Sequence, residues 1–228
     1  MLFPFLSTLL ILLGGASSLH VPHDDVHSVA IGLLADGTQE TLITTSAACR
    51  VLRTRDGGLS WQTVHGDGLE MARADFVVFD PHPLSRKFFI GTNQGVWSYS
   101  PDMGLVQFAS QGLPTGSGNF VTQLATSAGN SDGPLFLANK DGQVWAWNRS
   151  TSQWSLSLDS GFPEERGQVA VHPQFDSSGG VGSEQGVAAA FAGVLYLSAD
   201  GGNTWSVHSQ FSLPALLPTD PTITAIAF

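Results

Sequence analysis

The sequence predicts an all-β chain that folds as a β-propeller of four-stranded antiparallel blades, and three observations carry this prediction. An eight-residue pattern, S/T-x-D-x-G-x-S/T-W, occurs at residues 54–61 and again at residues 198–205. The two copies are 144 positions apart, three times 48, and one propeller blade takes about 40–50 residues. Apolar runs rich in β-branched residues recur at a similar spacing, and 26 of the 228 residues are glycine, as frequent turns require.

The recurring apolar runs are expected to be buried inner strands of successive blades. Their equivalent points are spaced by 48, 47, 45 and 57 residues. Only 12% of the residues are charged, so most strands are expected to be covered on both faces. The expected inner strands are Val26–Gly32, Phe76–Pro81, Val121–Ser127, Gln168–Pro173 and Thr222–Phe228.

A second and a third strand follow each inner strand, and the fourth begins near the Trp of the repeated pattern. The sequence thus predicts four complete blades and the first strand of a fifth, which makes the propeller incomplete at its C-terminal end. The expected second strands are Leu42–Ser46, Lys87–Thr92 and Leu135–Ala138. The expected third strands are Arg50–Thr54, Gly95–Tyr99, Gln143–Trp147 and Val194–Ser198.

The repeated pattern has the residues of a tight hairpin between the third and fourth strands. A Gly-Gly pair after an Asp suits a turn that needs positive φ. The Asp carboxylate can accept backbone N–H groups across the turn, and the hydroxyl two residues before it can brace the same loop. The Trp is expected to bury its ring against the neighbouring blade. The residues assigned this structural role are Thr54, Asp56, Gly58, Ser60 and Trp61 in the first copy, and Ser198, Asp200, Gly202, Thr204 and Trp205 in the second.

This pattern resembles the Asp-box, or BNR repeat, of the β-propellers of sialidases, xyloglucanases, sortilin-type receptors and photosystem II assembly factors. The resemblance implies a propeller fold but leaves function open, because enzymes and binding proteins share the repeat. The two middle blades carry degraded copies of the box. Residues 100–104 keep a Ser, an Asp and a Gly, and residues 148–152 keep neither Asp nor Gly in register.

Residues 1–18 are expected to be a secretory signal peptide, and residues 19–228 the propeller. The segment is an uncharged apolar run followed by small residues, with no Lys or Arg before it. No later stretch is long and apolar enough to cross a membrane. We therefore expect the chain to be secreted or to lie in the lumen of the secretory pathway, where Asn148, in the sequon Asn148-Arg149-Ser150, is a glycosylation candidate.

The net charge limits the classes of binding partner, and the cysteine content limits the possible disulfides. The net charge of −10, with only nine Lys and Arg, argues against nucleic acid and against anionic membranes as partners. Cys49 is the only cysteine, so no intrachain disulfide forms, and it is expected to be a small buried residue. No cofactor is expected.

Two kinds of glycosidase site find little support among the residues. A sialidase would need three converging arginines and a Tyr–Glu pair; the chain has two tyrosines, and Arg53 and Arg55 are expected to decorate strand edges. A xyloglucanase would need two carboxylates flanking a groove. The acids at strand ends that could serve are Asp24, Asp25, Asp75, Asp80 and Asp176, although acids are also ordinary at strand exits.

Two further sets of residues, a cluster of His and Asp side chains and a set of tryptophans, could each have either a structural or a functional role. The densest set of metal-ligand side chains is His20, His23, Asp24, Asp25 and His27, but polar residues are ordinary where a chain enters its first strand, so no metal is expected. Trp97, Trp145 and Trp147 are expected to pack between blades rather than to form a ligand platform, and Trp145 and Trp147 must share one strand face.

The sequence therefore favours a non-catalytic, secretory-pathway propeller that binds a protein, peptide or glycan. The alternative is a secreted glycoside hydrolase of the sialidase or xyloglucanase type.

Overall fold

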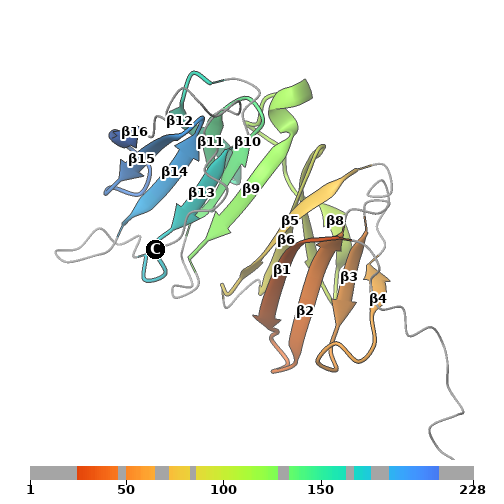
Figure 1. Cartoon of the computed structure of the whole chain (residues 1–228). Helices are drawn as coiled ribbons and strands as arrows, with labels where there is room; N and C mark the ends of the chain where they lie inside the picture. The colour runs from red at the N-terminus through yellow and green to blue at the C-terminus, as the bar shows by residue number, and fades with distance from the viewer. Residues whose placement is uncertain are drawn as a thin grey trace, which may run out of the picture.

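The computed structural model describes residues 25–45, 50–64, 72–82, 86–127, 134–162, 167–175 and 185–210. These residues form sixteen β-strands and one short 3₁₀-helix, η2 (Gly116–Asn119). The strands make four separate antiparallel sheets of four strands each, every sheet built from strands consecutive in the chain (Figure 1). The described part of the chain is therefore a run of four propeller blades.

Blades one and two occupy the N-terminal half. Blade one comprises β1 (Val26–Leu33), β2 (Gln39–Thr45), β3 (Val51–Thr54) and β4 (Gln62–Val64). Blade two comprises β5 (Ala74–Asp80), β6 (Lys87–Thr92), β7 (Gly95–Ser100) and β8 (Gly104–Gln107).

Blades three and four repeat this order. Blade three comprises β9 (Val121–Thr126), β10 (Leu135–Asn139), β11 (Gln143–Asn148) and β12 (Gln153–Asp159). Blade four comprises β13 (Gln168–Val171), β14 (Val187–Phe191), β15 (Val194–Ser198) and β16 (Ser206–Gln210). The predicted strand order is confirmed, with shifts of one to three residues at several ends. The expected strand Thr222–Phe228 lies outside the described residues.

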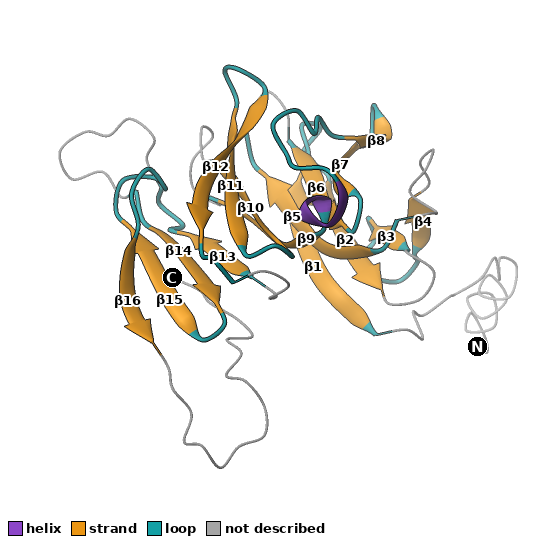
Figure 2. Ribbon diagram, turned by 90° about the horizontal axis from the view of Figure 1, so that it is seen from above, coloured by secondary structure: helices purple, strands orange, loops and turns teal. Residues whose placement is uncertain are grey.

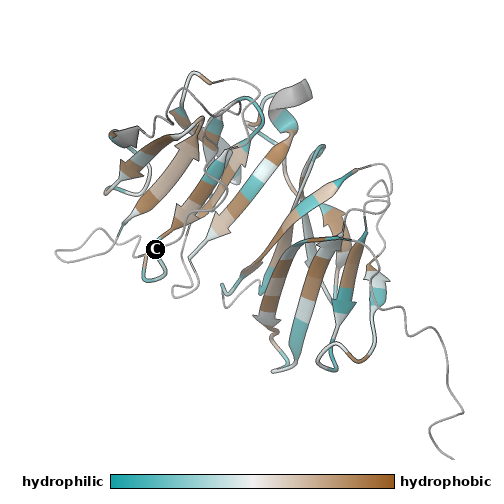
Figure 3. Ribbon diagram, in the orientation of Figure 1, coloured by the Kyte–Doolittle hydropathy of each residue, from teal (hydrophilic) through white to brown (hydrophobic). Residues whose placement is uncertain are grey.

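The blades pack face to face, and the inner strands β1, β5, β9 and β13 lie next to one another in that order. Viewed from above, the sheets fan out into an arc with blade one at one end and blade four at the other (Figure 2). Each pair of neighbouring blades encloses its own apolar cluster, centred on Phe88 between blades one and two, Phe89 between two and three, and Phe136 between three and four. Hydrophobic colours follow most strands, and hydrophilic residues gather at the ends of β2 and β3 and on β4 (Figure 3).

The first inner strand departs from the prediction that inner strands are buried. Val29, Ile31 and Leu33 of β1 are 55%, 59% and 55% exposed. These residues alternate along the strand, so they share one face, while Ala30 on the opposite face is buried against blade two. The face is exposed because, among the described strands, blade one has substantial contacts only with blade two.

No helix among the described residues is long and apolar enough to cross a membrane.

Candidate functional site

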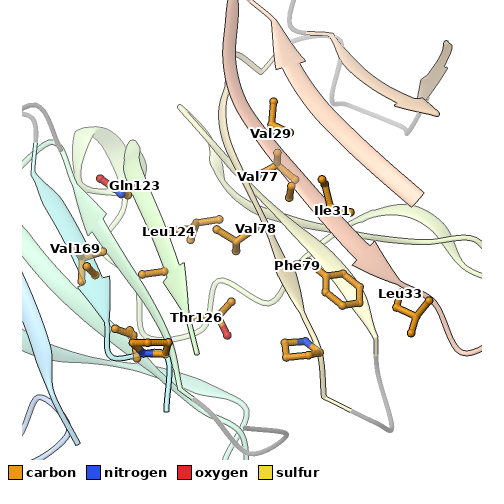
Figure 4. Close-up of a pocket in the computed structure, with 16 residues that line it drawn as sticks. Val29, Ile31, Leu33, Val77, Val78, Phe79, Gln123, Leu124, Thr126 and Val169 are labelled. Atoms are coloured by element: carbon orange, nitrogen blue, oxygen red, sulfur yellow. The ribbon is translucent and has the colours of Figure 1, made fainter. Parts of the chain in front are cut away.

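A hollow lies at the centre of the arc, where the free edges of the four inner strands meet (Figure 4). Each inner strand is the edge strand of its sheet and pairs with only one neighbour. The hollow has a volume of about 630 Å³. Its lining is Val29, Ala30, Ile31 and Leu33 from β1, Val77, Val78, Phe79 and Pro81 from blade two, Gln123 to Thr126 from β9, and Val169, Ala170, Val171 and Pro173 from blade four.

No charged side chain is among these lining residues, and only Gln123 and Thr126 have polar side chains. Within the described part of the chain, Gln123 Oε1 and Thr126 Oγ1 are buried and have no hydrogen-bond partner. Both oxygens are covered by protein atoms, so the lining offers a ligand few polar side-chain groups. The hollow suits an apolar ligand.

Side-chain hydroxyls hold neighbouring inner strands together in place of a backbone ladder. Ser28 Oγ donates to the carbonyl of Val77 at 3.3 Å and accepts from its amide at 3.2 Å. Thr122 Oγ1 donates to the carbonyl of Gly167 at 3.0 Å. These bonds satisfy backbone groups at the inner edges and fix the strands that line the hollow.

At the N-terminal ends of the inner strands lies a charged cluster centred on Asp75. Arg73 Nε donates to both carboxylate oxygens of Asp75, at 2.9 and 3.0 Å, and His27 Nδ1 lies 3.2 Å from Oδ1. The guanidinium of Arg73 also lies over the ring of Phe120, and so does the ammonium of Lys140. Asp75 is thus a buried carboxylate that contacts both Arg73 and His27.

At the opposite ends of these strands, Asp80 forms a bidentate ion pair with Arg149. The two guanidinium nitrogens of Arg149 donate to the two oxygens of Asp80, each at 3.0 Å, and Asp80 is only 1% exposed. Nearby, Lys87 Nζ lies 5.1 and 4.9 Å from the ring centroids of Phe89 and Phe108. Burial lowers the pKa of Lys87 below its ordinary value, against the opposing attraction of Asp80.

The positions of Asp75 and Asp80 do not suit a pair of hydrolytic carboxylates. They lie five residues apart on one strand, so about 17 Å separates them, and they point to opposite faces of the sheet. An inverting glycosidase needs roughly 6.5–9.5 Å between its two carboxyl groups. Each acid already accepts hydrogen bonds from an arginine. Both acids therefore have structural partners, as expected for strand-end carboxylates.

The expectation that Arg53 and Arg55 decorate strand edges is wrong. Both approach the fully buried Glu40 of β2: Arg53 Nη1 lies 3.3 Å, and Arg55 Nε 3.0 Å, from Oε1. Arg53 also binds the hydroxyl of Tyr99 across the boundary with blade two. Burial, then the charge of Glu40, raises the pKa of Tyr99. The pairing follows from the β2–β3 register and had no local sequence signal.

The first Asp-box forms the hairpin between β3 and β4. Thr54 Oγ1 donates to Asp56 Oδ1 at 2.7 Å and accepts the amide of Gly58 at 3.0 Å. The carboxylate of Asp56 accepts the amide and the hydroxyl of Ser60. These bonds, led by the one from the Ser60 hydroxyl, hold the pKa of Asp56 well below its usual range. Gly57 and Gly58 have φ of 73° and 93°, which favours glycine at both positions.

The second Asp-box repeats these contacts in the hairpin between β15 and β16. Ser198 Oγ donates to Asp200 Oδ1 and accepts the amide of Gly202, both at 2.8 Å. Asp200 accepts the amide and hydroxyl of Thr204, at 2.8 and 2.6 Å, and the hydroxyl is the first cause of its lowered pKa. All four of these hydrogen bonds join residues of the turn to one another.

The two box tryptophans differ in their surroundings. Trp205 packs in the cluster between blades three and four, and its Nε1 donates to Ser157 Oγ on blade three at 3.1 Å. Trp61 is half-buried and lies against Gly58 of its own turn. The expected packing on a neighbouring blade therefore holds for Trp205 but not for Trp61.

In blade three, Asn148 ends the third strand, at the position that Thr54 and Ser198 hold in the two Asp-boxes. Its Oδ1 accepts the amide and hydroxyl of Ser150, at 2.9 and 2.7 Å, and the amide of Thr151 at 3.1 Å. The degraded box at residues 148–152 therefore still forms a turn, which the side chain of Asn148 braces in place of the box hydroxyl.

The other tryptophans pack between blades, as expected. Trp97 is 4% exposed in the first inter-blade cluster, and Trp147 is 9% exposed in the second. Trp145, on the same face as Trp147, packs against that second cluster. None of these rings lines the central hollow.

Comparison with known proteins identifies the fold. The GH74 xyloglucanase from Xanthomonas campestris superposes with a TM-score of 0.60 at 20% identity, over 81% of this chain and 30% of that chain. The GH74 enzyme of Niastella koreensis gives 0.53 at 18% identity, over 74% of this chain and 27% of that one. The extracellular domain of BT4673, a proposed one-component system of B. thetaiotaomicron, gives 0.56 at 15% identity, over 87% and 24%.

At these identities the likeness shows the fold alone: the chain is a partial β-propeller. It spans less than a third of the length of each of these three proteins. No protein-family model matches the sequence, and no curated protein matches it.

Several predictions from the sequence lie outside the described residues. They are the signal peptide at residues 1–18, the state of Cys49, and four members of the acidic and histidine sets, His20, His23, Asp24 and Asp176. Asp25 is exposed, and His27 is the partner of Asp75. Among the described residues no three His, Cys, Asp or Glu side chains form a group that could hold a metal.

Proposed function

We propose that this chain is a non-catalytic propeller of the secretory pathway whose central hollow binds an apolar peptide segment of a protein partner. The observation that carries the proposal is a hollow of about 630 Å³ with no charged side chain in its lining. The inner strands have free edges toward it, so an extended peptide could add backbone hydrogen bonds to its apolar contacts.

A glycan fits the hollow less well than a peptide. Each sugar hydroxyl that is buried needs a hydrogen-bond partner. Among the lining side chains only those of Gln123 and Thr126 are polar, and the one aromatic ring is that of Phe79. Apolar side chains of a peptide need no such partners, which favours a protein partner.

Binding is tested with a peptide selected from a random displayed library on the immobilised chain, then labelled and titrated by fluorescence anisotropy. Gln123→Glu keeps the shape of the side chain but adds a charge that must lose water when the peptide binds. We expect it to raise the Kd at least about tenfold. The matched control is Gln107→Glu on the exposed end of β8, which should leave the Kd unchanged. A peptide whose Kd is the same for both variants would refute the hollow as the site.

The alternative function, glycoside hydrolysis, is supported by the fold of the two GH74 enzymes. It is examined in the same preparation by incubating the chain with xyloglucan and measuring reducing ends. If reducing ends are released, and an acid-to-amide substitution abolishes their release, the chain is a glycoside hydrolase and the binding proposal is wrong.

The proposed location rests on the apolar N-terminal run and on Asn148, the one N-x-S/T sequon in the chain. Asn148 is exposed at the end of β11, where a glycan would project into solvent. When the chain is expressed through a eukaryotic secretory pathway, we expect a mass increment that an N-glycosidase removes. Asn148→Gln should abolish the increment, and Asn130→Gln, outside any sequon, should keep it. Secretion without the increment would contradict glycosylation of Asn148.

A further inference from the structure

Another pocket, which we call the outer pocket, lies on the outer strands of blade one and shares no residue with the central hollow. Its volume is about 150 Å³, and its whole lining belongs to the β3–β4 hairpin. Every lining side chain is polar or charged. Drug-sized ligands fill pockets of about 300–1,000 Å³, so the outer pocket has room for a small polar molecule. The lining residues are Arg53, Thr54, Arg55, Asp56, Ser60 and Gln62.

The guanidinium of Arg55 is anchored by a buried acid and keeps its outer edge free. Its Nε lies 3.0 Å from Oε1 of Glu40, which is fully buried. Within the described part of the chain, the two terminal nitrogens of Arg55 donate to no residue. Two parallel N–H groups on such an edge match the two oxygens of a carboxylate. Arg55 therefore presents a fork for a carboxylate to the outer pocket.

Glu40 is already neutralised without Arg55. Arg53 Nη1 lies 3.3 Å from the same oxygen, Oε1, and Arg53 also binds the hydroxyl of Tyr99 in blade two. The other oxygen of Glu40, Oε2, is buried and has no hydrogen-bond partner among the described residues. Two guanidiniums thus share one carboxylate oxygen, and the pair leaves an excess of positive charge at the wall of the outer pocket.

The outer pocket has negative charge as well. Asp56 lines it, is exposed, and stays ionised because the hydrogen bonds of the turn hold its pKa well below its usual range. Asp36, exposed on the β1–β2 turn, lies close enough to attract Arg55. A lone anion would meet these two acids, and a lone cation would meet the two guanidiniums. The outer pocket is therefore matched to a molecule that carries both charges.

The second Asp-box shows that the turn does not require the other polar residues around the outer pocket. Ser198 and Asp200 make the bonds that Thr54 and Asp56 make in the first box. The flanking positions nevertheless differ between the two boxes. The counterparts of Arg53, Arg55, Gln62 and Glu40 are Leu197, Ala199, Ser206 and Gly186. The two arginines, the glutamine and the buried acid are thus additions in blade one beyond the needs of the turn.

We propose that the outer pocket binds a small zwitterion of the α-amino acid class, with its carboxylate on the Arg55 fork and its ammonium at Asp56. Oδ2 of Asp56 accepts the Ser60 hydroxyl and has room for one further donor. Gln62 Oε1 accepts from Arg53 Nη2 at 3.0 Å, which leaves the amide nitrogen of Gln62 to donate to the ligand carboxylate. The proposal is independent of what the central hollow binds.

Isothermal titration calorimetry of the full-length chain with each of the protein amino acids tests the site. We expect at least one to bind. Arg55→Lys keeps a positive charge beside Glu40 but loses the fork, so it should raise the Kd at least about tenfold. The matched control is Arg50→Lys, at an exposed arginine of the same blade outside the pocket, which should leave the Kd unchanged. Urea unfolding confirms that both variants fold. An equal Kd in the two variants, or no binding at millimolar concentration, would overturn the proposal.

Derivatives of the bound amino acid test each charge without any change to the protein. The N-acetyl form lacks the ammonium and the amide form lacks the carboxylate, and each should raise the Kd at least about tenfold. An N-acetyl form that binds as tightly as the parent would mean a site for carboxylates alone, and an equally tight amide would refute the role of the fork. Binding of a neutral sugar that Arg55→Lys weakens, with no binding of amino acids, would also overturn the proposal and assign the outer pocket to glycans.

Discussion

Arg149→Ala should lower the free energy of unfolding by about 3–5 kcal/mol, the usual cost of breaking a buried ion pair from one side. The substitution removes two charge-assisted hydrogen bonds from Asp80, a carboxylate that is 1% exposed. These bonds tie the inner strand of blade two to the β11–β12 hairpin of blade three, 69 residues away. Urea unfolding followed by tryptophan fluorescence measures the loss as a fall in the midpoint at constant m-value.

A second variant separates the buried charge from other effects of the substitution. Adding Asp80→Asn to Arg149→Ala removes the charge, so the double variant should be more stable than Arg149→Ala alone. Arg50→Ala, at an exposed arginine of blade one, is the matched control and should change stability by less than about 0.5 kcal/mol. If Arg149→Ala were as stable as the parent chain, the ion pair would not hold the two blades together.

The repeat and its strands could be predicted from sequence because their signals are local. Lys87–Thr92 and Val194–Ser198 agree with β6 and β15 at both ends. Each of these β-rich segments ends where turn residues follow, Asn93 after β6 and the Asp-box after β15. The hairpin bonds of the box were predictable for the same reason, because donor and acceptor lie within four residues of each other.

The site depends on contacts that no local pattern reveals. The pair of Asp80 with Arg149 and the approach of Arg53 to Tyr99 each join different blades, so they follow from how the blades pack. The hollow arises where four inner strands converge, and its lining includes core residues of these strands, such as Val77 and Val169.

The exposure of β1 was missed for a related reason. Its apolar residues have the same alternation as those of a covered strand, and sequence cannot say whether a neighbouring blade is present. What identifies the exposed face of β1 is the comparison of the four blades in space, because in blades two, three and four the corresponding face is covered by the preceding blade.

The two Asp-boxes test how burial of a turn amide affects the free energy of unfolding that is lost when its hydrogen-bond acceptor is removed. In the second box, Ser198 Oγ accepts the amide of Gly202, which is buried against Phe136 and Ser157 of blade three. Ser198→Ala leaves that amide without its acceptor in a place that water does not reach. We expect the free energy of unfolding to fall by about 1–3 kcal/mol, measured by urea unfolding.

In the first box, Thr54 Oγ1 accepts the amide of Gly58 at a similar distance, but Gly58 is exposed. Thr54→Val keeps the shape of the side chain and removes the hydroxyl, and water can then hydrate the freed amide. The loss should be below about 1 kcal/mol in the same urea unfolding measurement. Equal losses in the two boxes would mean that the turn bonds, and not burial of the amide against blade three, set the cost. A smaller loss for Ser198→Ala than for Thr54→Val would contradict the assignment of Ser198 as the brace of a buried turn.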